Sequence, residues 1–157
     1  MSNLFYEDTV FVTDKNKKEE VFEEISDILL KKGLVTECYL NNLSEREISY
    51  PTALPLTPID SSLPNIAVPH TESEFVNVTR LIPVKLKNPI EFKNMINPDE
   101  TVIVSFLFMI LNSDESEQAG LLAKIMEFIN TQSVDDLKTF FNLENTNDIY
   151  KYLKDNF

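Results

Sequence analysis

The run TVIVSFLFMIL, residues 101–111, is the most apolar stretch of the chain and constrains the fold most strongly. Successive side chains of a β-strand point to opposite faces of a sheet, and here both alternating sets are apolar. Such a strand has to be covered on both sides, as in a sheet with a layer of helices on each face. The run is also well short of the roughly 18 apolar residues that a membrane-spanning helix needs. We therefore expect a central strand in an α/β sandwich.

Other segments of the chain have the periodicity of strands and helices. Alternating or short apolar runs predict strands over 8–13, 65–68 and 78–86. Pro83 suggests that the third of these lies at a sheet edge or contains a bulge. Apolar residues at helical spacing predict two helices before residue 51 and three after about residue 115. The order indicates one domain, residues 1–157, with helices on both faces of a mixed sheet.

The ends and faces of these helices have local signals. Asp14 is a possible N-terminal cap of the first helix, and Gly33 is placed where a C-terminal cap is expected. The second helix is expected over 37–50, with Leu40, Leu43 and Ile48 facing the core. Further helix starts are expected at Ser133 and near Thr146. From 51 to 70 five prolines predict a stiff loop along the surface.

Composition narrows the possible functions. The formal net charge of −12 argues against nucleic acid and anionic membranes, both of which are bound by clustered Lys and Arg. The amino terminus has no signal-peptide pattern and no segment could insert into a membrane, so we expect a cytoplasmic protein. Two glycines exclude a Gly-rich phosphate loop, and one His with one Cys cannot build an ordinary zinc site. We expect no metal.

His70, the only histidine, lies in the segment PNIAVPHTESE, residues 64–74. A lone histidine is more often structural than reactive, and that alternative stays open. The spacing of Thr71 and Glu74 is that of a capping box, which would place His70 just before a helix N-terminus. Such a terminus binds anions, particularly phosphate, and a neutral imidazole there could attack a phosphoryl group. Glu72 and Glu74 oppose this reading by their charge. A dyad with Cys38, expected to be an inert packing residue, is a weaker alternative.

Two segments at this spacing resemble a known family. SEREISYPTALPL (44–56) followed by LPNIAVPHTESEFV (63–76) is similar to the enzyme IIA domains of the bacterial sugar phosphotransferase system, in the fructose–mannitol superfamily. The resemblance extends over about residues 5–157 and is greatest to the galactitol-type IIA proteins. It implies a mixed sheet of about five strands flanked by helices, the type-2 IIA fold.

The resemblance also implies a phosphotransferase activity and a set of site residues. His70 would accept a phosphoryl group from the phosphocarrier HPr and pass it to a cysteine of a cognate IIB, which serves a membrane IIC; no cofactor would be required. Arg46 would hold phosphate oxygens; its alternative is an ion pair with Glu45 or Glu47. Thr52 would contribute a hydroxyl near the site, or serve only as a turn residue.

Two more residues are candidates for phosphate binding, and two positions depart from the family pattern. Thr71 and Gln118 could each donate a hydrogen bond to phosphate. Ala53 stands where the family has a glycine, so a positive φ would be disfavoured there. Glu117–Ala119 lacks the second histidine of mannitol- and fructose-type members, as galactitol-type members do.

Partner docking and two other functions complete the set of expectations. Leu54, Leu56 and Phe75 are candidates for an apolar docking surface around His70, with core burial the alternative for Phe75. One other function is a IIA-like regulatory domain whose phosphorylation controls a partner protein. The other is a non-catalytic α/β protein with an inert histidine.

Overall fold

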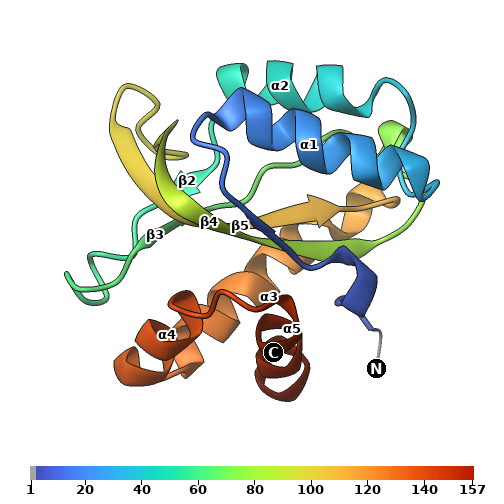
Figure 1. The fold of residues 1–157 in the computed structure, drawn as a ribbon. Coiled ribbons are helices and arrows are strands. Elements are labelled where there is room, and N and C mark those ends of the chain that lie inside the picture. Colours follow the sequence, from blue (N-terminus) through green and yellow to red (C-terminus); the bar gives the residue numbers. More distant parts are fainter. Residues whose placement is uncertain (1–2) are drawn as a thin grey trace.

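A five-stranded mixed sheet separates two layers of helices (Figure 1). The computed structural model describes residues 3–157. The strand order is β1-β4-β5-β3-β2, with β1 parallel to β4, β5 parallel to β3, and the other two neighbouring pairs antiparallel. The strands are β1 (Phe11–Thr13), β2 (Ala53–Leu54), β3 (Asn65–Ala67), β4 (Arg80–Lys93) and β5 (Thr101–Leu111). The predicted mixed five-stranded α/β sandwich is confirmed.

The helices divide unevenly between the two faces of the sheet. Two helices, α1 (Lys18–Lys31) and α2 (Tyr39–Ser49), lie on one face, and three lie on the other (Figure 1). The second layer consists of α3 (Gln118–Thr131), α4 (Val134–Phe141) and α5 (Thr146–Asn156). Each layer has its own apolar core against the sheet. Short 3-10 turns occupy Glu7–Thr9, Ser73–Phe75 and Glu115–Glu117.

The central position predicted for 101–111 is confirmed, but its coverage is uneven. β5 pairs with β4 on one side and with β3 on the other. Every residue from Phe106 to Leu111 is buried, as a strand covered on both faces requires. In the first half burial alternates, and Ile103 is 47% exposed between the buried Val102 and Val104. The helices therefore cover both faces only over the second half of the strand.

Pro83 lies in an interior strand, so the expected edge position is wrong. β4 pairs with both β1 and β5, and its register shift falls between Lys85 and Ile90 rather than at the proline. The N–H of Leu81 points away from β5 and donates to the Leu4 carbonyl. The backbone nitrogen of Pro83, two residues further along the strand, points to the same side. Pairing with β1 begins only at Val84. The missing N–H of Pro83 thus falls where the neighbouring strand is interrupted.

Helix ends followed local signals in some places and not in others. Gly33 has φ of +75° and Leu34 N–H donates to the Leu29 carbonyl at 3.0 Å, so the predicted C-cap of α1 is confirmed. Ser133 caps α4 by accepting from the Asp136 N–H, also as predicted. Asp14 does not cap α1, which begins after Lys17 without a side-chain cap.

The inward face of α2 was predicted correctly at Leu43, which is buried, and wrongly at Ile48, which is 77% exposed. The buried residue on the last turn of this helix is Glu47 instead. The apolar spacing failed here because a carboxylate has taken the core-facing position.

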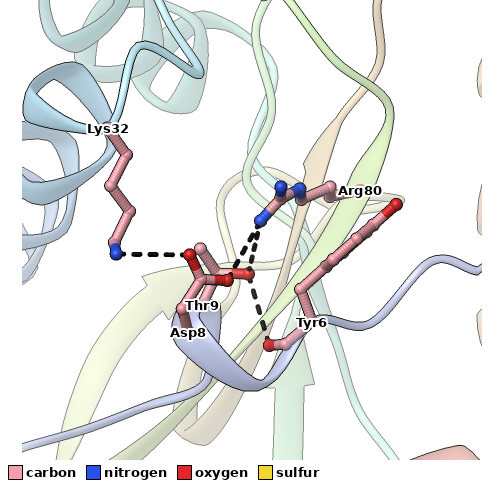
Figure 2. A network of polar contacts seen from close by, with 5 residues as sticks. All are labelled: Tyr6, Asp8, Thr9, Lys32 and Arg80. Atoms are coloured by element: carbon pink, nitrogen blue, oxygen red, sulfur yellow. Dashed lines mark hydrogen bonds and ion pairs between the residues drawn. The ribbon is translucent and has the colours of Figure 1, made fainter.

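A polar cluster fastens the N-terminal segment to the rest of the fold (Figure 2). The Arg80 guanidinium on β4 lies 3.3 Å from the Asp8 carboxylate and stacks over the Tyr6 ring, with Cζ 3.7 Å from the ring centroid. Lys32, just after α1, pairs with the same carboxylate at 3.3 Å. This cluster joins the chain before β1 to β4 and to the end of α1.

Neither a membrane span nor a metal cluster occurs in the described part of the chain. None of the helices within 3–157 has the length and apolar character needed to cross a membrane. No group of three or more His, Cys, Asp or Glu side chains in that range is arranged to hold a metal ion.

Candidate functional site

His70 lies at the end of the sheet where β3 and β5 finish together. These strands are parallel, so their carboxyl ends meet at one edge. Beyond β3 the chain continues along β5, and the Ile110 N–H donates to the Pro69 carbonyl at 3.0 Å. A single bridge pairs His70 with Ile110. The backbone carrying the imidazole is therefore held by a strand, although His70 itself is outside β3.

The backbone orients the imidazole and selects its tautomer. Nδ1 lies 2.8 Å from the Val68 carbonyl oxygen. A carbonyl only accepts hydrogen bonds, so Nδ1 carries the proton and Nε2 of the neutral ring keeps a lone pair. Burial lowers the pKa of His70, and Arg46 lowers it further, whereas the bond to Val68 opposes both effects. The half-buried ring is therefore neutral near pH 7 and nucleophilic at Nε2.

A small open pocket of about 190 Å³ surrounds this imidazole. The residues that line it come from three separate parts of the chain and include Arg46, His70, Thr71, Glu72, Asn112 and Gln118. The fold thus brings together four of the five predicted site residues; Thr52 does not line the pocket.

Arg46 reaches the pocket from the last turn of α2. Its guanidinium stacks on Tyr50, with Cζ 5.2 Å from the ring centroid, and Nη1 lies 3.6 Å from Oε1 of Glu72. Among the described residues it has no ion pair with Glu45 or Glu47, the alternative partners expected from the sequence. The separation from Glu72 is long, and both side chains are partly exposed, so this pair is weak. An incoming phosphoryl group can therefore compete for the guanidinium.

The capping box predicted after His70 does not form. Thr71 donates its hydroxyl to the Glu72 carbonyl at 2.9 Å, and only a three-residue 3-10 turn, Ser73–Phe75, follows. Val76 forms a bridge with Val35, and Thr36 N–H donates to the Phe75 carbonyl. These contacts with the connection between α1 and α2 draw the chain into extended geometry after a single turn. The prediction of a helix-terminus anion site next to His70 is therefore wrong.

An amide pair, Asn112 and Gln118, forms part of the pocket lining. α3 begins at Gln118, whose Oε1 accepts from Asn112 Nδ2 at 3.2 Å. Both hydrogens of the Gln118 amide nitrogen remain available to an acceptor in the pocket. Asn112 is buried, and its own Oδ1 accepts from the Asp114 N–H. Sequence reasoning missed Asn112, although a polar residue directly after the apolar run 101–111 is a signal that could have identified it.

Thr52 and the buried carboxylate of Glu47 hold the backbone that orients His70. The Thr52 N–H and hydroxyl donate to the two oxygens of Glu47 at 2.8 and 2.7 Å. The Thr52 carbonyl accepts from the Val68 N–H at 3.2 Å, and Val68 in turn orients His70. Glu47 is 4% exposed, and burial raises its pKa to about 7 against the opposing effect of the Thr52 bonds. The sequence suggested Glu47 only as an ion-pair partner of Arg46, so its buried bonds to Thr52 were missed.

The other positions singled out in the sequence have mixed outcomes. Ala53 pairs with Ala67 within the sheet, and no non-glycine residue of 3–157 has a positive φ, so the loss of a glycine causes no strain. Leu56 is fully buried, which excludes it from a docking surface; Leu54 and Phe75 are half-buried against the cores. Cys38 is exposed at the start of α2 and does not line the pocket.

The arrangement can accept an anionic group with a tetrahedral or trigonal centre. It offers a neutral imidazole nitrogen, a guanidinium and a carboxamide around one small space. A guanidinium and amide N–H groups match phosphate oxygens in geometry and charge. Such groups can position a phosphoryl group and stabilise its charge, which is most of what a protein has to supply for phosphoryl transfer.

Comparisons with known proteins agree with this reading. A sequence profile of the family "Phosphoenolpyruvate-dependent sugar phosphotransferase system, EIIA 2" matches residues 3–156. The galactitol-specific EIIA component of Escherichia coli is 26% identical over 146 residues, which cover 93% of this chain and 90% of that protein.

Two solved structures have the same fold. The crystal structure of mannitol IIA from Escherichia coli superposes with a TM-score of 0.69 at 20% identity, covering 96% of both chains. The complex of mannitol IIA with phosphorylated IIB, from the same organism, gives 0.61 at 20% identity, over 85% of this chain and 93% of the other. Because the family profile spans nearly the whole chain, the protein belongs to the type-2 enzyme IIA family of the sugar phosphotransferase system and is a phosphotransferase.

Proposed function

We propose that this protein is a phosphocarrier that takes a phosphoryl group from phospho-HPr onto Nε2 of His70 and delivers it to a cysteine of a cognate IIB. The free lone pair of Nε2, left by the bond from Nδ1 to the Val68 carbonyl, carries the proposal. The name of the Escherichia coli relative supports a galactitol-type polyol as the transported sugar.

In the first step Nε2 attacks the phosphorus in line with the bond to the donor. The N–P bond of phospho-HPr breaks as the new N–P bond forms, and the electron pair of the broken bond returns to the donor imidazole. Nδ1 keeps its proton throughout, and its bond to the Val68 carbonyl stabilises the positive charge that develops on the ring. Arg46 and the Gln118 amide bind the equatorial oxygens, where charge is distributed in the transition state.

In the second step a thiolate of IIB attacks the same phosphorus. A P–S bond forms, the N–P bond breaks, and His70 returns to the neutral tautomer that began the cycle. The pocket offers the phosphoryl group one guanidinium and neutral donors, with Glu72 competing for that guanidinium at 3.6 Å. This balance stabilises the group without trapping it.

The partners follow from this cycle. The solved complex of mannitol IIA with phosphorylated IIB supports docking of a IIB on the surface around His70. Ile48 and Tyr50, both exposed and close to Arg46 in sequence, are the apolar side chains we assign to that surface. Since IIA acts between HPr and the IIB that serves a membrane IIC, we place the protein in the cytoplasm.

The test is transfer of labelled phosphate from phospho-HPr. We expect the wild-type protein to become labelled at His70 Nε2, which ³¹P NMR distinguishes from Nδ1, and His70→Ala to fold normally but remain unlabelled. Adding a galactitol-type IIB should then discharge the label onto its cysteine. Labelling of His70→Ala would contradict the assignment of the nucleophile. A label that no IIB can discharge would favour the regulatory domain.

A further inference from the structure

Glu47 is the one charged side chain among the described residues that is buried. It takes a core-facing position on the last turn of α2. An apolar side chain there would avoid the free-energy cost of removing a carboxylate from water. Local rules of this kind are broken mainly at functional sites, so the contacts of the carboxylate indicate its role.

The carboxylate of Glu47 binds both donors of Thr52 and so fixes the start of β2. Its Oε2 accepts from the Thr52 N–H at 2.8 Å, and its Oε1 accepts from the Thr52 hydroxyl at 2.7 Å. β2 is an edge strand of two residues, shorter than most strands, and its own ladder holds it only weakly. The two bonds to Glu47 therefore determine where Thr52 lies relative to α2.

Two further hydrogen bonds connect Thr52 to the imidazole. The Thr52 carbonyl accepts from the Val68 N–H at 3.2 Å, and the Val68 carbonyl accepts from Nδ1 of His70 at 2.8 Å. In each residue the N–H and the carbonyl belong to successive peptide groups, so the connection transmits position rather than charge. On its other side the segment is held by β5, through the carbonyl of Pro69. Thr52 is thus one of two supports of the carbonyl that selects the tautomer of His70.

Glu47 also joins the two halves of the pocket. Arg46, the preceding residue, reaches the pocket from the same helical turn. The place of its guanidinium relative to His70 therefore depends on how the end of α2 is held against the segment after β3. Polar contacts between α2 and the chain after His70 are longer: the Asn42 side-chain oxygen accepts from the Glu72 N–H at 3.3 Å, and the Arg46–Glu72 pair is separated by 3.6 Å.

We propose that Glu47 is a positioning residue for phosphoryl transfer, which through its two bonds to Thr52 maintains the Nδ1–H tautomer of His70 and the place of Arg46 beside it. This inference rests on the proposed function. Glu47 does not line the pocket and acts only through its partners. Its charge is not required, because a carboxylic acid or a carboxamide can make the same two bonds.

Two uncharged substitutions of similar length separate the hydrogen bonds of Glu47 from its charge. Glu47→Gln keeps both bonds, whereas Glu47→Met keeps the size and the helix propensity but accepts neither. With phospho-HPr as donor, we expect kcat of Glu47→Gln to stay within about twofold of wild type. We expect kcat of Glu47→Met to fall on the order of tenfold or more at unchanged KM, because the reacting groups are misplaced while the donor still binds.

Nitrogen NMR of the imidazole measures the positioning without a phosphoryl donor. His70 is the only histidine, so ¹⁵N-histidine labelling gives the signals of one ring. We expect the Nδ1–H tautomer in wild type and in Glu47→Gln, and a mixture with the Nε2–H tautomer in Glu47→Met. If wild type takes no label from phospho-HPr, the proposed function fails, while this measurement still decides whether Glu47 positions the ring.

Two more variants separate positioning from stability. Leu43→Ala opens a cavity one turn earlier on α2 and should lower the urea midpoint but keep the wild-type kcat. Thr52→Val removes only the hydroxyl bond, so its kcat should fall by about threefold; it decides the case if Glu47→Met does not fold. An unchanged kcat or tautomer in Glu47→Met, an equal loss of kcat in Glu47→Gln or Leu43→Ala, or an unchanged kcat in Thr52→Val would overturn the proposal.

Discussion

Glu47 makes a pH-dependent contribution to stability that a single substitution should remove. Burial raises its pKa from 4.5 to about 7 in the folded protein. Between these values the folded state keeps a proton that the unfolded chain has released, so the stability falls as the pH rises. At about 1.4 kcal/mol per pKa unit, the loss between pH 4.5 and 8 is about 3 kcal/mol.

Glu47→Gln reproduces the protonated form. The nitrogen of the introduced carboxamide can donate to the Thr52 hydroxyl while its oxygen accepts from the Thr52 N–H, so both links to Thr52 survive. We expect wild type and variant to be about equally stable near pH 5, and the variant to be about 2–3 kcal/mol more stable at pH 8. Urea denaturation across this pH range measures the difference.

Two features of the design isolate Glu47. The lowered pKa of His70 has the opposite sign, since its contribution is gained as the pH rises toward 6.5, but it is common to both proteins and cancels in the difference. Glu45→Gln, which removes the same charge from an exposed residue of α2, should follow the wild-type curve. Parallel curves for wild type and Glu47→Gln would refute the reasoning, and so would a variant that is less stable at pH 8.

Two further substitutions test the site and the N-terminal cluster. Arg46→Gln should slow phosphoryl transfer from phospho-HPr on the order of 100-fold at unchanged thermal stability, because the guanidinium is partly exposed and its ion pair is weak; transfer at the wild-type rate would remove Arg46 from the mechanism. Arg80→Ala should lower the free energy of unfolding by about 1–2 kcal/mol through loss of the Tyr6 stack and the Asp8 pair, without changing transfer. The control is Lys31→Ala, which breaks the solvent-exposed ion pair with Asp27. Urea denaturation should show that it lowers the free energy of unfolding by less than about 0.5 kcal/mol.

The parts of the fold that sequence predicted well depend on local or periodic signals. The apolar run 101–111 identified the central strand, and Gly33 and Ser133 marked helix ends, because each acts through its immediate neighbours. The capping box after His70 was an equally local signal and failed. Pairing of Val76 with Val35, 41 positions earlier in the chain, outweighed it.

The candidate site shows the same division. His70 was singled out as the only histidine, the resemblance added Arg46, and the structure places both at one pocket. Asn112 and the bonds from Thr52 to Glu47 were not predicted, because each depends on how the chain turns after a strand or helix ends: Gln118 follows Asn112 by six residues, and Thr52 follows Glu47 by five. Periodicity assigned the inward position to the neighbouring Ile48, since a buried carboxylate is an uncommon occupant of a core-facing position.

The amide pair at Gln118 also explains how the site could work with a single histidine. A second histidine could become cationic and bind a phosphoryl dianion strongly, whereas a carboxamide donates hydrogen bonds without a charge. Asn112 fixes the Gln118 oxygen, so the amide hydrogens face the pocket without a further cost in side-chain entropy. Phosphohistidine here would then be held mainly by Arg46, and its transfer should respond less to pH between 6 and 8 than in a site with two histidines. The rate of transfer from phospho-HPr should be measured between pH 6 and 8 for the wild type and for Gln118→Ala. A steep pH dependence of that rate in both proteins would contradict this expectation.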